Sequence, residues 1–208
     1  MNILAIETST KDASLCLMKK GSICAASAWQ AERNHDSFLF PALEKALLFL
    51  DAESLDLILV GAGPGSYGGV RVALAAAVGV ATVKASHVVS ICSWWGLTPQ
   101  DTCMVSDAKR GGWTVLRPGG DITVLTTDAL KEEAGKGLSL VTVETEETLA
   151  RHVLTAMKYD IKPTAENLIQ AWLSLPEEKK EELKAAPAEP IYVRPPHITE
   201  AKRKPWQI

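Results

Sequence analysis

One stretch near the start of the sequence combines residue types that could do chemistry. Glu7-Thr8-Ser9-Thr10 places a carboxylate and three hydroxyl groups in a row after a short apolar segment. A hydroxyl-lined turn of this kind can hold a phosphate, with the carboxylate on a metal ion or a water molecule. The same residues also suit an ordinary polar turn, whose hydroxyls bond to their own backbone. Spacing alone favours the polar turn.

A glycine-rich stretch, Gly61-Ala62-Gly63-Pro64-Gly65-Ser66, lies between a predicted strand and a predicted helix. This arrangement is a natural anion cradle, because free N–H groups and the positive end of the helix dipole meet at the helix start. Gly63–Gly68 also matches G-x-G-x-x-G, but the region of Ala85–Ser90 holds no carboxylate for a ribose. The Gly-Lys-Ser/Thr of a P-loop is absent as well. Both nucleotide loops are therefore disfavoured.

The helix that follows suggests a third interpretation. Its small residues recur at helical spacing and form one face, which consists of Ala73, Ala76, Ala77, Val80 and Ala81. A face of small side chains lets another helix approach closely, either inside the fold or on a second chain. Ser66 can cap the helix start. An ordinary core helix remains the alternative.

Other chemistries lack their residue sets. No two of the histidines, His35, His87, His152 and His197, have the i,i+4 spacing of a helical metal clamp. No Gly-x-Ser-x-Gly elbow is present for a hydrolase nucleophile. The tail Lys202–Trp206 is the basic patch with an aromatic residue, and it could contact RNA, although short basic termini are usually solvated.

Composition restricts the class of protein. A chain of 208 residues can form one domain or two small ones, and its net charge of −3 gives no overall footprint for nucleic acid. The four cysteines have no C-x-x-C spacing, so we expect reduced, buried thiols. The first residues do not resemble a signal peptide, and Val72–Val83 is too short and alanine-rich to span a bilayer. We expect a soluble, cytoplasmic protein.

The first half, residues 1–100, reads as βββαβαβ, which predicts a mixed sheet with helices on its faces. The expected strands are Asn2–Glu7, Ser14–Lys19, Ser22–Trp29, Asp56–Val60 and His87–Ile91, and the expected helices are His35–Leu50 and Val70–Lys84.

A change of composition at Cys92–Asp101 is the best boundary between subdomains, so residues 101–208 are expected to form a smaller α/β unit with an extended tail. Its expected strands are Cys103–Ser106, Gly112–Leu116, Asp121–Leu125 and Ser139–Val143, and its expected helices are Thr145–Met157, Thr164–Ser174 and Pro176–Lys184. No internal repeat is evident in the sequence.

Several segments, in order, resemble the TsaB (YeaZ) family. They are Ile3–Thr10, the helix after His35, Gly63–Val72, Asp107-Ala108-Lys109-Arg110-Gly111 and Pro190–Arg194. The glycine-rich segment is the most specific of these. The resemblance implies an actin-like (ASKHA) fold with two ribonuclease-H-like halves, the second one reduced.

The resemblance further implies a non-catalytic partner of TsaD, which forms N6-threonylcarbamoyladenosine at position 37 of tRNAs that read codons beginning with A. TsaE would join this pair, tRNA would bind the assembly, and ATP and a metal ion would lie on partner subunits, with no cofactor on this chain. The helices after His35 and Ser66 would form the contact with TsaD or with a second copy. The implied contact residues are His35, Leu39, Leu43, Ser66, Tyr67, Val70, Arg71, Ala73, Leu74, Ala76, Ala77 and Val80. Glu7, Thr8, Ser9 and Thr10 would be a vestigial phosphate loop.

The sequence departs from the family pattern in two of these segments. Tyr67-Gly68 stands where the family usually has Phe-Thr, and Gly112-Trp113 follows the Asp107 turn where Glu-Val-Tyr is usual. A small active ATP-dependent phosphotransferase of the actin-like superfold is the alternative. It would need a second phosphate loop and an adenosine pocket, and no glycine-rich loop in the second half suits either.

Overall fold

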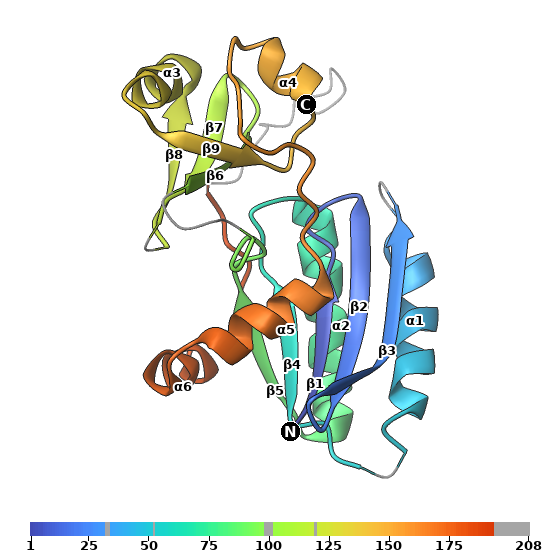
Figure 1. The fold of residues 1–208 in the computed structure, drawn as a ribbon. Helices are drawn as coiled ribbons and strands as arrows, with labels where there is room; N and C mark the ends of the chain where they lie inside the picture. Colours follow the sequence, from blue (N-terminus) through green and yellow to red (C-terminus); the bar gives the residue numbers. More distant parts are fainter. Residues whose placement is uncertain (32–33, 52, 98–101, 119, 194–208) are drawn as a thin grey trace, which may run out of the picture.

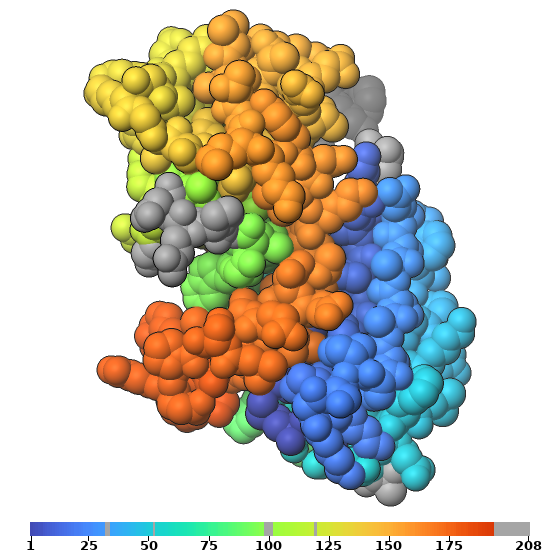
Figure 2. All heavy atoms as spheres, in the orientation of Figure 1, coloured from blue at the N-terminus to red at the C-terminus, as the bar shows by residue number. Residues whose placement is uncertain are grey.

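The computed structural model describes residues 1–31, 34–51, 53–97, 102–118 and 120–193. Each of two lobes is built around one β-sheet (Figure 1). Figure 2 shows the second lobe, in yellow and orange, above the blue and cyan first lobe. The tail Lys202–Trp206, Thr98–Asp101 of the expected boundary, and Arg194 lie outside the described residues.

The first sheet has the strand order β3-β2-β1-β4-β5. Its strands are β1 (Asn2–Glu7), β2 (Asp12–Lys19), β3 (Ser22–Gln30), β4 (Leu57–Gly61) and β5 (His87–Ile91). The first three form an antiparallel meander, and β4 and β5 run parallel to β1. Helices α1 (Asp36–Leu48) and α2 (Tyr67–Lys84) make the crossovers. The predicted βββαβαβ order is confirmed.

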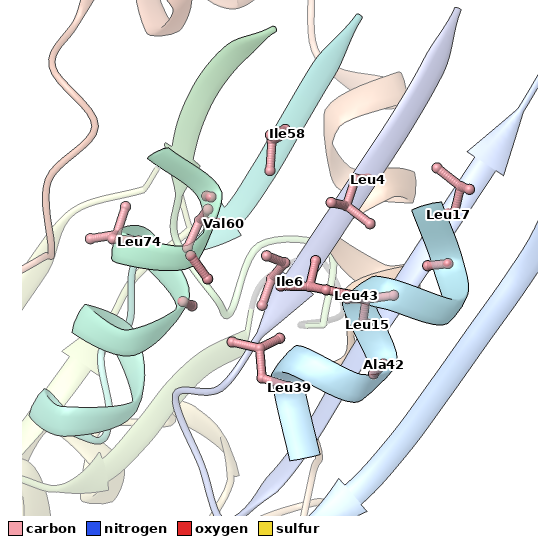
Figure 3. Packing of buried hydrophobic residues seen from close by; sticks show 14 of the residues in the cluster. Leu4, Ile6, Leu15, Leu17, Leu39, Ala42, Leu43, Ile58, Val60 and Leu74 are labelled. Atoms are coloured by element: carbon pink, nitrogen blue, oxygen red, sulfur yellow. The ribbon is translucent and has the colours of Figure 1, made fainter. Parts of the chain in front are cut away.

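The central strand β1 is buried on both faces because different helices cover its two sides. Its alternation sends Leu4 and Ile6 into the cluster shared with α1 and α2, as Figure 3 shows, and Ile3 and Ala5 into a second cluster on the other face. Side chains alternate between the faces of a strand, so a strand covered on both faces is apolar at every position. The run Ile3–Ile6 has this pattern, and all four residues are fully buried.

The second sheet has the order β8-β7-β6-β9. Its strands are β6 (Thr102–Asp107), β7 (Gly112–Leu116), β8 (Ile122–Thr126) and β9 (Ser139–Thr142), with α3 (Thr127–Gly135) between β8 and β9. Order and directions repeat those of β3-β2-β1-β4, with α3 in the place of α1. The chain therefore contains a structural repeat that its sequence does not reveal. In the second copy the short helix α4 (Glu146–Ala150) follows β9 as α2 follows β4, and a single parallel bridge between Val141 and Lys158 lies where β5 would pair.

In the second half one helix was missed and one local prediction is wrong. Helix α3 was not predicted, because only one of its side chains, Leu130, is buried. The expected helix Thr145–Met157 ends early, since α4 spans only Glu146–Ala150. Beyond it the chain turns back to the sheet, where the Met157 N–H donates to the Leu140 carbonyl (2.7 Å).

The expected division at residue 100 also needs correction. Helices α5 (Ala165–Ser174) and α6 (Glu177–Ala185) return to the first lobe, where α5 lies across β1, β2 and β4 (Figure 1). Leu168, Ile169 and Trp172 bury on the face of the sheet that α1 and α2 leave open. That apolar face must be covered, and the apolar stripe of α5 covers it.

Candidate functional site

The loop after β1 carries the carboxylate that the sequence singled out. Glu7 is fully buried, and its Oε1 accepts the N–H of Ser9 (2.6 Å), whereas Oε2 has no hydrogen-bond partner among the described residues. Burial raises the pKa of this carboxyl, and the hydrogen bonds from Ser9 offset that only in part. Glu7 is thus enclosed beneath the loop instead of projecting to a ligand.

The glycine-rich segment and the start of α2 contact this loop through hydrogen bonds and close packing. The Thr8 hydroxyl donates to the Gly69 carbonyl (2.8 Å), and the Ser66 N–H donates to the Ser9 carbonyl (2.6 Å). A Cβ on Gly65 or Gly69 would lie less than 3.0 Å from the carbonyl oxygens of Ser9 and Thr8 respectively, closer than real Cβ atoms come. We name these contacts the loop clasp. The start of α2 thus binds the protein's own backbone.

Of the three hydroxyl groups in this loop, that of Thr8 takes part in the loop clasp. Thr8 and Ser9 are buried, and Thr10, which is partly exposed, donates its hydroxyl to the Asp12 carbonyl (2.7 Å). This is the polar turn that spacing favoured, with its hydroxyls enclosed or bonded to backbone.

A cleft of about 500 Å³ lies between the lobes. It brings together segments that are distant in sequence, and its lining includes Ser9, Thr10, Gly65, Ser66, Tyr67, Trp94, Asp107, Ala108, Lys109, Pro190, Ile191, Tyr192 and Val193. The loop after β1, the glycine-rich segment, the Asp107 turn and the late Pro190–Val193 segment of the family pattern therefore meet at one place.

Charges in the cleft are largely paired. Lys109 lies 2.9 Å from Asp107, and Lys162 lies 3.4 Å from Asp12. Burial raises the pKa of Asp107, but the hydrogen bonds from the backbone and ammonium of Lys109 outweigh it and lower the pKa overall. Glu144 also lines the cleft and accepts the Asp107 N–H (3.0 Å). The cleft is thus lined by charges of both signs, with Lys11, Lys109 and Lys162 beside Asp12, Asp107, Glu144 and Asp160.

The predicted small-residue face of α2 points into the protein. Ala73 and Ala77 are fully buried and Ala76 nearly so, packed on the first sheet. Four of the other nine implied contact residues also lie in that core, namely Leu39, Leu43, Val70 and Leu74, while Val80 packs against it and His35 is buried too. The core-helix alternative is correct for this face, because the sheet's apolar side must be covered.

The opposite side of α2 carries a row of exposed residues four apart, which we name the outer stripe: Tyr67, Arg71, Ala75, Gly79 and Val83. Residues four apart are neighbours on the surface of a helix, and each step of four turns by about 40°, so the row winds across the exposed side of α2 from Tyr67 to Val83. Part of the stripe lines an apolar groove of about 460 Å³ between α1 and α2. The groove is formed by Phe40, Leu43, Leu47, Ala75, Ala76, Gly79, Val80, Val83 and Lys84.

Some of the groove's own apolar side chains are strongly exposed, and Val83 is 82% exposed. Among the predicted contact residues, Leu43, Ala76 and Val80 line the groove, while Tyr67 and Arg71 lie on the outer stripe.

Sequence reasoning missed Phe40, Ala75, Gly79 and Val83, although a signal was present. Val72–Val83 has no charged residue on any side, so α2 is apolar all round. By length and composition α2 could even cross a membrane, but its inner face is packed on the sheet.

Metal and thiol chemistry have little support within the described part of the chain. No group of three His, Cys, Asp or Glu side chains there could hold a metal ion. Burial raises the pKa of the Cys16 thiol to about 11 and that of Cys92 to about 12, so neither is a reactive thiolate.

Comparisons with known proteins agree with this geometry. The family model described as TsaD, tRNA N6-adenosine threonylcarbamoyltransferase, matches residues 29–172. The tRNA threonylcarbamoyladenosine biosynthesis protein TsaB of Bacillus subtilis is 36% identical over 74 residues, which cover 35% of this chain and only 32% of that protein.

Two solved structures also match over nearly their whole length. YeaZ from Pseudomonas aeruginosa superposes with a TM-score of 0.65 at 20% identity, over 92% of this chain and 99% of that one. A structure from the same organism, described as similar to peptidase YEAZ, gives a TM-score of 0.67 at 22% identity, over 93% and 99%. These matches confirm the predicted actin-like fold with two ribonuclease-H-like halves, the second one reduced.

Proposed function

This chain belongs to the family described as TsaD, tRNA N6-adenosine threonylcarbamoyltransferase, and within it to the TsaB (YeaZ) group; from this premise we propose that it is a non-catalytic partner of TsaD. In this role it supports the complex that forms N6-threonylcarbamoyladenosine at position 37 of tRNAs reading codons that begin with A. Its contribution is a docking surface, and TsaD carries out the transfer.

The apolar groove between α1 and α2 is the observation that carries this proposal. Its lining is almost entirely aliphatic or aromatic, and Val83 and Phe40 stand more than half exposed there. Large exposed apolar patches mark interaction surfaces, because their burial against a partner is favourable. Ala75 and Gly79 add a second property, since small residues let a partner helix approach closely.

The loop clasp supports a non-catalytic role. A phosphotransferase of this fold, the alternative function, would need the hydroxyls after β1 to face its nucleotide. Here Ser9 and Thr10 line the cleft, but Thr8 donates its hydroxyl to Gly69, Thr10 donates its hydroxyl to Asp12, and Glu7 is fully buried.

The wider assembly follows from the same proposal. TsaE joins the pair and tRNA binds the assembled complex in the cytoplasm, while ATP and a metal ion are held by the partner subunits. Without TsaD, a second copy of this chain could occupy the groove, because a two-fold contact requires only a self-complementary surface.

Titration of this protein with TsaD from the same organism tests the proposal. Gly79→Glu places a charge in the groove, and its desolvation should weaken TsaD binding by about 100-fold. Val78→Glu is the matched control: Val78 is 52% exposed on the same helix but does not line the groove. Gly79→Glu does not endanger folding, since glutamate favours a helix more than glycine does.

The outcomes separate clearly. The proposal expects wild type and Val78→Glu to bind TsaD alike, and Gly79→Glu to elute separately on a sizing column at micromolar concentration. Equal binding by all three proteins would remove the groove from the interface. ATP hydrolysis by the purified chain alone would favour the alternative function, an active ATP-dependent phosphotransferase.

A further inference from the structure

The chain after α6 crosses from the first lobe toward the second, visible as the red trace in Figure 1. We name residues 189–193 the C-terminal strap. The Glu189 N–H donates to Ser90 Oγ (3.1 Å), and the Ile191 N–H donates to the Ala62 carbonyl (2.8 Å). These bonds attach the strap to β5 and to the residue that follows β4, at the edge of the cleft.

The side chain of Ile191 lies at the junction of the lobes. It packs against a buried cluster with members from both sides, which consists of Cys92, Trp94, Met104, Leu116, Val141 and Ile161. Cys92 and Trp94 follow β5 of the first sheet, whereas Met104, Leu116 and Val141 lie in the second sheet. Separation of the lobes would therefore expose Ile191 and this cluster to water, and the cost of exposing these apolar side chains opposes the separation.

The next residue joins the strap to α2. The ring of Tyr192 lies 5.5 Å from that of Tyr67, centroid to centroid, and both residues are more than half exposed. Arg71 lies 5.0 Å from the centroid of the Tyr67 ring, and its Nη1 donates to Tyr67 Oη (3.1 Å). Tyr67 and Arg71 are the first two residues of the outer stripe, so the strap ends at the beginning of a row whose later members, Ala75, Gly79 and Val83, line the groove.

We propose that the C-terminal strap is a clamp between the lobes, and that a partner seated along the outer stripe of α2 tightens it. The identity of that partner, TsaD, rests on the proposed function. A partner that covers Tyr67 and Tyr192 removes both rings from water, so the docked strap is favoured over a released one. Binding and clamping are then thermodynamically coupled, and each strengthens the other.

Hydrogen exchange measured on the full chain, with and without TsaD, tests this coupling. We expect TsaD to slow exchange about tenfold in peptides that contain Glu189–Val193, a middle value for coupling between sites. Tyr192→Ala should abolish this slowing, while Tyr192→Phe keeps the ring and should retain it. Groove peptides from α1 and α2 report TsaD binding independently in every variant.

The groove peptides distinguish the two ways of failing. Protected groove peptides with an unchanged strap would overturn the tightening of the clamp by TsaD and leave the proposed function standing. If saturating TsaD slowed hydrogen exchange in neither the groove peptides nor the strap peptides, the proposed function would be overturned. The proposal that TsaD tightens the strap would then fail as well.

A second comparison tests the clamp without a partner. Ile191→Asp puts a charge into the shared cluster, so exchange should become faster in peptides covering Cys92–Leu97 and Met104–Asp107. Val153→Asp is the control, because Val153 is 81% exposed in the second lobe. Equal exchange in these peptides for Ile191→Asp, Val153→Asp and wild type would show that the strap does not hold the lobes.

Discussion

Replacement of one glycine of the loop clasp tests how the loop after β1 is held. Gly69 lies in the first turn of α2, where alanine would ordinarily stabilise the helix by about 1 kcal/mol. In this structure a Cβ at Gly69 would lie less than 3.0 Å from the Thr8 carbonyl oxygen, which is a backbone atom in a packed interior. We therefore predict that Gly69→Ala destabilises the protein.

The magnitude follows from the groups that must move. Displacement of Thr8 strains the packed loop at about 1–3 kcal/mol, and loss of its hydrogen bond to Gly69 leaves a buried hydroxyl unpaired at about 1–3 kcal/mol. After the helix gain is subtracted, the free energy of unfolding should fall by about 3 kcal/mol. For a chain of this size the melting temperature should fall by roughly 6–12 °C.

Gly68→Ala is a control at the adjacent position. A Cβ there meets no atom within 4 Å, so only the helix preference acts, and the free energy of unfolding should rise by up to about 1 kcal/mol. Urea unfolding followed by circular dichroism measures both variants against wild type. Neighbouring glycines should thus give effects of opposite sign. If Gly69→Ala stabilised the protein as Gly68→Ala does, the close approach of Thr8 would be refuted.

Three further predictions concern buried titratable groups. Because burial raises the pKa of Glu7, the contribution of Glu7 to stability is lost as pH rises above about 4.5. Urea titrations at pH 4.5 and 8 should show the free energy of unfolding of Glu7→Gln increasing relative to that of wild type. A constant difference between the two proteins would contradict this. Burial lowers the pKa of His35, although the charge of Asp36 opposes this. The free energy of unfolding should therefore fall as pH drops below about 6.5, and it should fall less in His35→Asn. Equal losses of stability at pH 5 in wild type and His35→Asn would contradict the burial of this imidazole. At pH 8 a thiol reagent should modify partly exposed Cys24 before buried Cys16 and Cys92, whose pKa values are about 11 and 12; early labelling of Cys92 would argue against its burial.

Periodicity in the sequence predicted the first lobe well, because its strands and helices have strong apolar patterns. The strand His87–Ile91 was predicted to the residue, and Asn2–Glu7 likewise. The apolar pattern of α2 did not predict which of its faces is buried. A helix that is apolar all round gives no indication of which face packs on its own sheet and which remains outside, so the buried alanines were assigned to an interface.

Other features depend on contacts that no local pattern records. The approach of Thr8 to Gly69 joins residues far apart in the chain and is visible only in three dimensions. The return of α5 to the first sheet depends on which apolar face lacks a cover. The strap was noticed as part of a family pattern, but its place between the lobes could not be predicted from sequence.

The central claim is that this chain contributes docking and no chemistry, and the rate of threonylcarbamoyl transfer by a reconstituted TsaD system tests it most directly. The rate is measured as the concentration of this protein is raised, with wild type, Gly79→Glu and the control Val78→Glu. The account predicts that Gly79→Glu requires about 100 times more protein for half of the maximal rate but reaches the same maximum. Equal half-saturation for Gly79→Glu and wild type, or transfer by this chain without TsaD, would contradict it.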